Sequence, residues 1–378
     1  MQTNRPDIWK EILLGNVLTL EYGKALDAEE RVPDGKYPAY GANGVKCRCN
    51  KYLSDTPSII IGRKGSAGEI NYSENKFWVL DVAYYVKFDK SKLDIRFLFY
   101  LLKNKNLPSL AKGVKPGINR NDVYSIKVKI PPLSEQERIV RILDEVFENI
   151  EKAKQNTLKN LNNAKELFES HLNTLLCYFE INGKYKHLSE LTTVKDGTHE
   201  SPKYVKIGIP FITQKNIKDN GLVFITQDTK YISEEDHSKF YQRSNVEQGD
   251  ILISMIGANR GMACLVDIKN IFSIKNVGLI KFNSNINMKY LLYFLKSKFA
   301  KKYIDTKSKG GAQEFISLTS LRNFPILYVD IKDQEYIVQQ LDRTKENIQK
   351  LEQIYNQKLK SLEELKQTIL QKAFNGEL

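Results

Sequence analysis

The sequence predicts an α+β protein in which two mixed α/β domains and two long helices form a pseudo-two-fold internal repeat. Three observations lead to this prediction. The segment 133–155 aligns without a gap with 331–353, both segments have the period of an amphipathic helix, and the residues before each contain short apolar runs separated by glycine-rich turns. The order along the 378-residue chain is therefore domain, helix, domain, helix.

The two copies of the repeat are 198 residues apart, and their helical parts match best. Gln136 and Asp144, for example, have identical counterparts in Gln334 and Asp342. Each copy is predicted to form one helix of about 38 residues, because apolar side chains recur every three or four positions and no Pro or Gly intervenes.

Both helices break the strict heptad at the same place, near Thr157 and Tyr355. A shared break indicates that the two helices pack on each other in a fixed register, whereas unrelated surface helices would not share it. The predicted seam, which we also expect to serve in docking partner subunits, consists of Ile139, Leu143, Val146, Ile150, Leu161 and Leu172 in the first helix and Ile337, Leu341, Ile348, Leu351, Leu359 and Leu370 in the second.

The repeat also sets the domain boundaries. We expect the first domain at 1–130, its helix at 131–177, the second domain at 178–328 and the last helix at 329–378. In each domain a strand runs into a glycine-rich turn, and a short apolar helix follows further along the chain. The second domain is longer by about 22 residues.

The composition excludes several classes of protein. No run of 18 apolar residues is present, so no membrane-spanning helix is expected. The first residues lack the basic-then-apolar order of a signal peptide, and the four Cys and four His residues do not have metal-ligand spacing. We therefore expect a cytoplasmic protein with reduced cysteines, no metal and no contact with a membrane.

The net charge of +13 is carried by the two domains. Residues 1–130 and 178–328 each have a net charge of +8, whereas 131–177 and 329–378 have −2 and −1. Basic domains favour a polyanion such as double-stranded DNA, because neutralised phosphates release counterions. Nearly neutral amphipathic helices are typical of protein–protein contacts.

Motifs for catalysis are missing from the sequence. There is no GxxxxGK[ST] loop and no DPPY-type or NPPF-type tetrapeptide for amino-group methylation, and the glycines after 57–61 precede another strand instead of a helix. The stretch VPDGKYP lacks the second acidic residue of a metal-dependent nuclease. We expect no catalytic residue and no cofactor bound by this chain, which argues against a stand-alone methyltransferase.

Several loops combine glycines with the side chains that contact phosphates and base edges. For any one residue, an ordinary solvated loop is an equally good interpretation. The loops differ between the two domains while the helices are alike, as expected if the domains read different sequences. The predicted DNA-binding residues are Arg63, Lys64, Ser66, Lys112, Lys115, Asn119, Arg120 and Asn121 in the first domain, and Thr198, His199, Lys203, Tyr204, Gln214, Lys215, Asn216, Asn259, Arg260, Lys309 and Gln313 in the second.

With these features, the sequence resembles the specificity subunits of type I restriction-modification systems. The resemblance spans nearly the whole chain and rests on IPPLSEQERIV, its second copy DIKDQEYIV and the final LEELKQTILQKAFNGEL, together with stretches such as DGTHESP and PGINRNDVYSIKV. It implies two target recognition domains that each bind half of a bipartite, asymmetric DNA site, joined by an antiparallel coiled coil.

The resemblance also implies the partners of the chain. Two modification subunits, which carry S-adenosylmethionine and methylate adenine N6 after base flipping, would dock on the helices. Restriction and translocation subunits would join through them. The alternative to this interpretation is a non-enzymatic coiled-coil scaffold whose domains bind proteins and whose positive charge is incidental.

Overall fold

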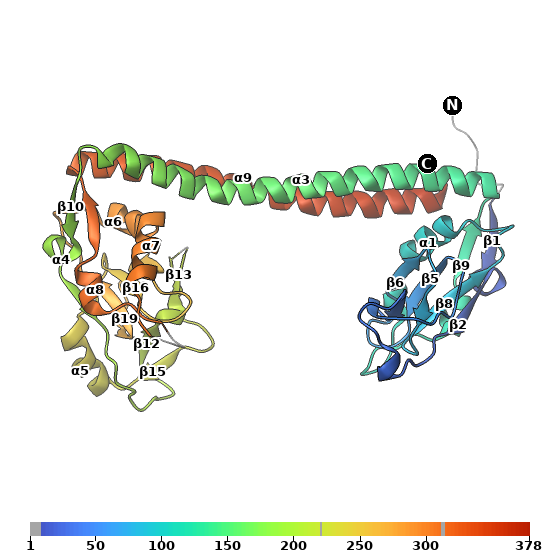
Figure 1. Ribbon diagram of the computed structural model, residues 1–378, viewed down its shortest axis with the longest axis horizontal. Coiled ribbons are helices and arrows are strands. Elements are labelled where there is room, and N and C mark those ends of the chain that lie inside the picture. The colour runs from blue at the N-terminus through green and yellow to red at the C-terminus, as the bar shows by residue number, and fades with distance from the viewer. Residues whose placement is uncertain (1–8, 220, 311–313) are drawn as a thin grey trace. The chain divides into compact units, whose positions relative to one another are not determined.

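The computed structural model describes residues 9–219, 221–310 and 314–378. The chain divides into two compact units (Figure 1). Unit 1 combines Met1–Leu158 with Asn356–Leu378, and unit 2 is Lys159–Tyr355. Each unit contains one mixed α/β domain and the parts of the two long helices that pack on it. Within the described residues, no helix has the length and apolar character needed to cross a membrane.

Domain 1 is built on two small sheets. The four-stranded sheet has the order β2-β8-β5-β6 and is antiparallel throughout, and a three-stranded sheet has the order β4-β3-β7. A separate antiparallel pair, β1 and β9, leads toward the first long helix. The strands are β1 (Lys10–Leu13), β2 (Leu18–Tyr22), β3 (Tyr37–Gly41), β4 (Gly44–Cys49), β5 (Ser58–Gly62), β6 (Ile70–Ser73), β7 (Trp78–Val79), β8 (Ala83–Phe88) and β9 (Lys127–Ile130), and the helices are α1 (Ile95–Asn104) and α2 (Arg120–Tyr124).

The core of unit 1 explains why the three isoleucines at 59–61 follow one another without a polar residue between them. Ile59 and Ile61 of β5 face a cluster that includes Phe97 of α1, whereas Ile60 faces the other side with Phe77. A strand that is buried on both faces has no solvent side on which to place polar residues. Figure 1 shows α1 between this sheet and the helix pair.

Domain 2 repeats this arrangement. Its two larger sheets have the orders β11-β19-β16-β17 and β15-β12-β18, β10 pairs with β20, and β13 and β14 form an additional antiparallel pair. The strands are β10 (Lys184–His187), β11 (Val194–Asp196), β12 (Ile209–Thr213), β13 (Ile217–Lys218), β14 (Gly221–Leu222), β15 (Lys230–Ile232), β16 (Ile251–Ser254), β17 (Ala263–Leu265), β18 (Ser273–Lys275), β19 (Val277–Ile280) and β20 (Pro325–Tyr328), and the helices are α4 (Leu188–Leu191), α5 (Glu234–Ser244), α6 (Met288–Leu295), α7 (Lys298–Lys307) and α8 (Leu318–Arg322).

The extra length of domain 2 includes α5. This helix lies between β15 and β16, where domain 1 passes from β4 to β5 through the short loop 50–57. Ser233 caps α5 by accepting a hydrogen bond from the amide of Asp236, and Asn245 ends it in the left-handed conformation. The prediction of two versions of one mixed α/β unit is confirmed, and α5 distinguishes the second version from the first.

The two long helices are α3 (Leu133–Glu180) and α9 (Ile331–Asn375). They have 48 and 45 residues, so the predicted length of about 38 was too short. In α3 the helix continues three residues past the expected end at 177, because the next residue that breaks a helix is Gly183.

The pairing of α3 with α9 is antiparallel. In unit 1, the beginning of α3 packs with the end of α9, as Leu143 and Leu370 share one core cluster. In unit 2 the end of α3 packs with the beginning of α9, where the ring Nδ1 of His171 lies 2.8 Å from the hydroxyl of Thr344. Of the predicted seam residues, Ile139, Leu143, Ile150, Leu172, Ile337, Leu341, Ile348 and Leu370 are buried, and Val146, Leu161, Leu351 and Leu359 are half-buried.

A buried glutamine fastens each domain to its helix. The Gln136 side chain accepts a hydrogen bond from the amide of Asp94 and donates to the carbonyls of Lys92 and Pro131, all at 2.9 Å. Gln334 accepts from the amide of Asn287 and donates to the carbonyl of Val329, both at 2.8 Å. Both side chains are fully buried, so the same device joins the loop before α1 or α6 to the start of the long helix.

A tyrosine–aspartate pair provides a second joint about two turns further along each helix. The hydroxyl of Tyr100 donates to Asp144 and that of Tyr293 donates to Asp342, each at 2.5 Å. Burial opposes ionisation of Asp342, but hydrogen bonds from Tyr293 and Lys289 outweigh it and hold the pKa of Asp342 below its ordinary value. The repeat of glutamine and aspartate was visible in the sequence, but their partners in the domains were not.

Candidate DNA interface

In domain 1, two of the loops predicted to bind DNA lie side by side. The turn after β5, residues 62–68, carries Arg63 and Lys64. Its Gly65 amide donates to the carbonyl of Pro116 at 2.9 Å, and the Ile118 amide donates to the carbonyl of Arg63 at 3.0 Å. The loop 112–117 is itself closed by two backbone hydrogen bonds between its end residues. Residues that are about 50 positions apart in the sequence therefore share one surface.

Glycine is required in the turn after β5 for conformational reasons. Gly65 and Gly68 have φ angles of +78° and +82°, and Gly257 and Gly261 in the corresponding turn of domain 2 have +74° and +85°. Residues other than glycine rarely adopt these values, so each turn depends on two glycines, which are three positions apart in domain 1 and four positions apart in domain 2.

The side chains of the domain 1 site are largely available to a ligand. Arg63 and Ser66 are half-buried, and the other predicted residues are exposed, namely Lys64, Lys112, Lys115, Asn119, Arg120 and Asn121. Several of them also make local contacts; for example, Lys112 pairs with Asp122 at 3.0 Å, and Asn119 caps α2 by accepting from the amide of Asn121. A basic, exposed surface with a rigid backbone is what phosphate and base contacts require.

Tyr22, at the end of β2, belongs to the same site and was not predicted from the sequence. It is 45% exposed, and the guanidinium carbons of Arg63 and Arg120 lie 4.9 and 5.3 Å from the centre of its ring. These distances are in the range of cation–π contacts. Together with Tyr84, Gly117 and neighbouring residues, Tyr22 and Arg63 line a depression of about 320 Å³.

The corresponding loops of domain 2 have a different chemistry. Arg260 lies in the turn after β16, but its side chain is only 16% exposed and contacts Asp305 at 3.3 Å and Glu314 at 2.5 Å. Its Nε also donates to the hydroxyl of Ser308 at 2.8 Å. These contacts connect the turn to α7 and to the following loop, so the structure favours a structural role for Arg260. Asn259 and Lys309 are exposed nearby.

Other predicted residues of domain 2 are divided between exposed and internal positions. Asn216 is buried, and its side chain accepts from the amide of Thr213 and donates to the carbonyl of Val223. Gln214 accepts from the hydroxyl of Ser254 at 3.1 Å, which places it beneath the turn after β16. Lys203, Tyr204 and Lys215 are exposed, and Gln313 lies outside the described residues.

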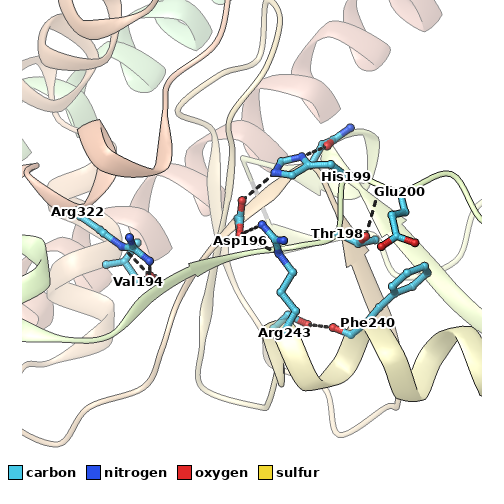
Figure 2. A network of polar contacts seen from close by, with 10 residues as sticks. Val194, Asp196, Thr198, His199, Glu200, Phe240, Arg243 and Arg322 are labelled. Atoms are coloured by element: carbon cyan, nitrogen blue, oxygen red, sulfur yellow. Dashed lines mark hydrogen bonds and ion pairs between the residues drawn. The ribbon is translucent and has the colours of Figure 1, made fainter.

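Thr198 and His199 lie at the end of β11, within a network around Asp196 (Figure 2). The hydroxyl of the buried Thr198 accepts from the amide of Glu200. The exposed ring of His199 contacts Asp196 at 3.0 Å through Nε2 and Asn276 at 2.7 Å through Nδ1. Arg243 of α5 donates twice to the other carboxylate oxygen of Asp196, at 2.7 and 3.2 Å. The sequence offered no signal for Arg243, because it lies in a helix.

Among the described residues, no group of three or more His, Cys, Asp or Glu side chains is arranged to hold a metal ion. The four cysteines are unpaired with one another. Burial raises the pKa of the Cys264 thiol to about 12, so this thiol stays protonated in the core of domain 2.

Solved structures with a similar fold cover the whole chain. One comes from work described as the structural basis of complex assembly and conformational transition of the type I R-M system, and it matches with a TM-score of 0.73 and 17% identity over 99% of both chains. The crystal structure of the HsdS subunit from Thermoanaerobacter tengcongensis matches with a TM-score of 0.60 and 18% identity over 99% of this chain and 98% of the other. These matches confirm the fold class.

The sequence comparisons define the class more closely. Residues 6–160 and 182–361 each match the family model described as the type I restriction modification DNA specificity domain. A putative type I restriction enzyme specificity subunit of Haemophilus influenzae is 28% identical over 329 residues, covering 82% of this chain and 80% of the relative. The MjaVIII specificity subunit of Methanocaldococcus jannaschii is 24% identical over 408 residues, covering 99% and 93%.

Two such domains, each followed by a long helix, define a DNA-recognition subunit. The chain belongs to the type I restriction-modification DNA specificity family. Its general function is therefore DNA sequence recognition within a type I restriction-modification system, and the predicted family is confirmed.

Proposed function

We propose that this chain is the non-catalytic subunit that reads a bipartite, asymmetric DNA site, with domain 1 on one half-site and domain 2 on the other. The observation that carries the proposal is the difference between corresponding loops on a common frame. The four-stranded and three-stranded sheets of the two domains share one topology. The turn after β5, however, carries Arg63 and Lys64, whereas the turn after β16 carries Asn259 and an internally paired Arg260. Different side chains on one frame suit the reading of two different sequences.

We further propose that two adenine-N6 methyltransferase subunits dock on the helices, bind S-adenosylmethionine and supply the chemistry, and that restriction and translocation subunits join through them. The buried seam residues are occupied by contacts within the chain. The apolar side chains left for a partner include Leu167 and Leu365, which are 52% and 46% exposed and occupy the same position in the two copies of the repeat. Two equivalent docking points fit two copies of one partner.

The proposed complex acts on double-stranded DNA, which together with the free cysteines is consistent with the cytoplasm. No catalytic group and no cofactor are assigned to this chain. S-Adenosylmethionine binding by the isolated chain would contradict that part of the proposal.

The test is a binding and methylation experiment on the full chain purified with its modification partner. Methylated adenines are mapped in host DNA with and without this subunit, and the affinity for the resulting site is compared with that for scrambled DNA at one fixed salt concentration. We expect a two-part motif and an affinity for it at least about 10³-fold above that for random DNA. Equal affinity for both DNAs, or salt-insensitive association with protein alone, would instead support the scaffold alternative.

A further inference from the structure

The two domains can be compared residue by residue at one strand end. In domain 1, Tyr84 of β8 pairs with both Tyr22 of β2 and Ile61 of β5. In domain 2, Gly278 of β19 pairs with both Asp196 of β11 and Ile253 of β16. The strand registers therefore make Tyr22 and Asp196 equivalent positions.

A glycine fixes the backbone immediately after each of these residues. The amide of Gly23 donates to the carbonyl of Ala83 at 3.0 Å, and that of Gly197 donates to the carbonyl of Val277 at 2.9 Å. A Cβ atom on Gly23 would lie 2.0 Å from the carbonyl oxygen of Leu80, and one on Gly197 would lie 2.3 Å from that of Ile274. The strand end is thus held closely against the neighbouring backbone, and the preceding side chain has a defined position.

In domain 1 the side chain of Tyr22 orients Arg63. The guanidinium of Arg63 lies over the Tyr22 ring at 4.9 Å, and its Nη1 donates to the carbonyl of Asp81 at 3.0 Å. Tyr22 is held in turn by an edge contact with Tyr84, whose ring centre is 5.1 Å away. Two fixed contacts leave the remaining N–H groups of Arg63 to point in a limited set of directions.

In domain 2 the equivalent position also orients an arginine, by a different interaction. The Asp196 carboxylate, with a side chain 8% exposed, accepts two hydrogen bonds from Arg243, which remains 50% exposed. Figure 2 shows Asp196 between Arg243, which reaches it from α5, and His199 on the other side. Because one carboxylate oxygen takes the Nε and one Nη2 contact, other N–H groups of the fork are left to contact a ligand.

The two arginines come from elements that do not correspond. Arg63 follows β5, whose equivalent in domain 2 is β16, whereas Arg243 lies in α5, which is inserted before β16. A guanidinium therefore lies at the equivalent strand end in both domains, although it comes from a turn in domain 1 and from a helix in domain 2. The fold itself does not require this. Domain 2 has no arginine at the position that corresponds to Arg63, and domain 1 has no helix that corresponds to α5, which carries Arg243. A common function of the guanidinium at this strand end accounts for its presence in both domains.

We infer that each strand end presents an arginine to the major-groove edge of a guanine, Arg63 in one half-site and Arg243 in the other. Tyr22 and Asp196 are the positioning residues. This inference rests on the proposed DNA-binding function and adds the specificity-determining side chains to it. Bidentate contact with guanine O6 and N7 needs a planar fork in a fixed direction, which the two buttressed arginines provide, whereas a phosphate contact needs only positive charge.

The test keeps the positive charge of each arginine and removes its planar guanidinium group. The full chain carrying Arg63→Lys or Arg243→Lys is produced with its modification partner, and the methylated motif is mapped as for the wild type. Arg141→Lys, an exposed arginine on α3, is the matched control. We expect each variant to lose about 5- to 150-fold of its selectivity at a single guanine position, in opposite halves of the motif, while the control keeps the full motif.

The positioning role is tested at Tyr22. Tyr22→Leu removes the aromatic ring and should reduce the selectivity at the same motif position as Arg63→Lys. Tyr22→Phe retains the ring face and should keep the wild-type motif. Thermal unfolding of each variant shows whether the domain is still folded. A purely structural role would lower the stability without changing the motif.

Two results overturn the inference. An unchanged motif in both arginine variants would do so, as would uniformly weaker binding to all DNA, which is the signature of a phosphate contact. If the wild-type complex itself gives no two-part motif, the proposed function fails, and that outcome is distinct from failure of the arginine assignment.

Discussion

Replacement of the buried Gln136 by leucine should destabilise unit 1 strongly. The substitution keeps the approximate volume of the side chain but removes three hydrogen bonds of 2.9 Å, to the amide of Asp94 and the carbonyls of Lys92 and Pro131. Each polar group left without a partner costs about 1–3 kcal/mol, and water can reach part of the site because Asp94 is only half-buried. We expect a loss of about 3–5 kcal/mol in the free energy of unfolding.

The assay is urea denaturation together with hydrogen exchange, which locates the loss within the chain. For a unit of this size, the expected destabilisation lowers the melting temperature by about 6–20 °C. Amide protection should fall first at residues 92–97 and around the start of α3, where the partners of Gln136 lie. Gln334→Leu should cost less than Gln136→Leu, because Gln334 makes two such hydrogen bonds instead of three.

Gln155→Leu is the matched control for this prediction. Gln155 is on the same helix and is also identical in the other copy of the repeat, but it is exposed and makes one hydrogen bond to Glu151 at 3.3 Å. A change within about 0.5 kcal/mol is expected there. If Gln136→Leu and Gln155→Leu unfold alike, the buried amide does not fasten the domain to the helix and the reasoning is wrong.

Three further predictions concern substitutions in the helix seam, the stability of unit 2 at acidic pH, and the order in which cysteine thiols are labelled. Leu143→Asp or Leu341→Asp places a charge in a fully buried position, which should lower the free energy of unfolding by more than about 4 kcal/mol and prevent assembly. Leu365→Asp, on the exposed face, should keep the melting temperature within a few degrees of the wild-type value. Because the pKa of Asp342 is lowered in the folded state, its stabilising contribution is present above the unfolded pKa and is lost as the pH falls below about 4. Asp342→Asn should therefore flatten the decline of unit 2 stability in acid, as measured by thermal melts from pH 6 to 2.5. A thiol reagent should label the exposed Cys177 first and Cys264 only after unfolding, since burial raises the pKa of Cys264 to about 12; rapid labelling of Cys264 in the native protein would contradict its placement in the core.

The repeat, the two domains and the helix seam could be predicted because periodic burial leaves a direct record in the sequence. Ile139, Leu143 and their counterparts at 337 and 341 recur at helical spacing, and each is buried as expected. The ends of the helices were predicted less well, since residues near 177 have no local signal that stops a helix before Gly183.

The side chains of the candidate site were harder to predict, because their role depends on partners that are distant in the sequence. Arg63 and Arg260 look alike as arginines in glycine-rich turns. Only the fold shows that Arg260 meets Asp305 and Glu314, which lie 45 and 54 residues away, while Arg63 lies over Tyr22. Asn216 was predicted to bind DNA for its residue type, but its amide is used inside the domain.

The equal charge of the two domains hides an unequal distribution at the corresponding loops. In domain 1, the turn after β5 and the loop 112–117 expose Lys64, Lys112 and Lys115, with one acidic partner at Asp122. In domain 2 the corresponding turn has its arginine neutralised by two carboxylates, and Lys309 is exposed in the loop beside it. Counterion release follows the cations that face phosphates and not the net charge of the domain. Domain 1 should therefore contribute more than domain 2 to the salt dependence of binding at these loops, although each domain has a net charge of +8.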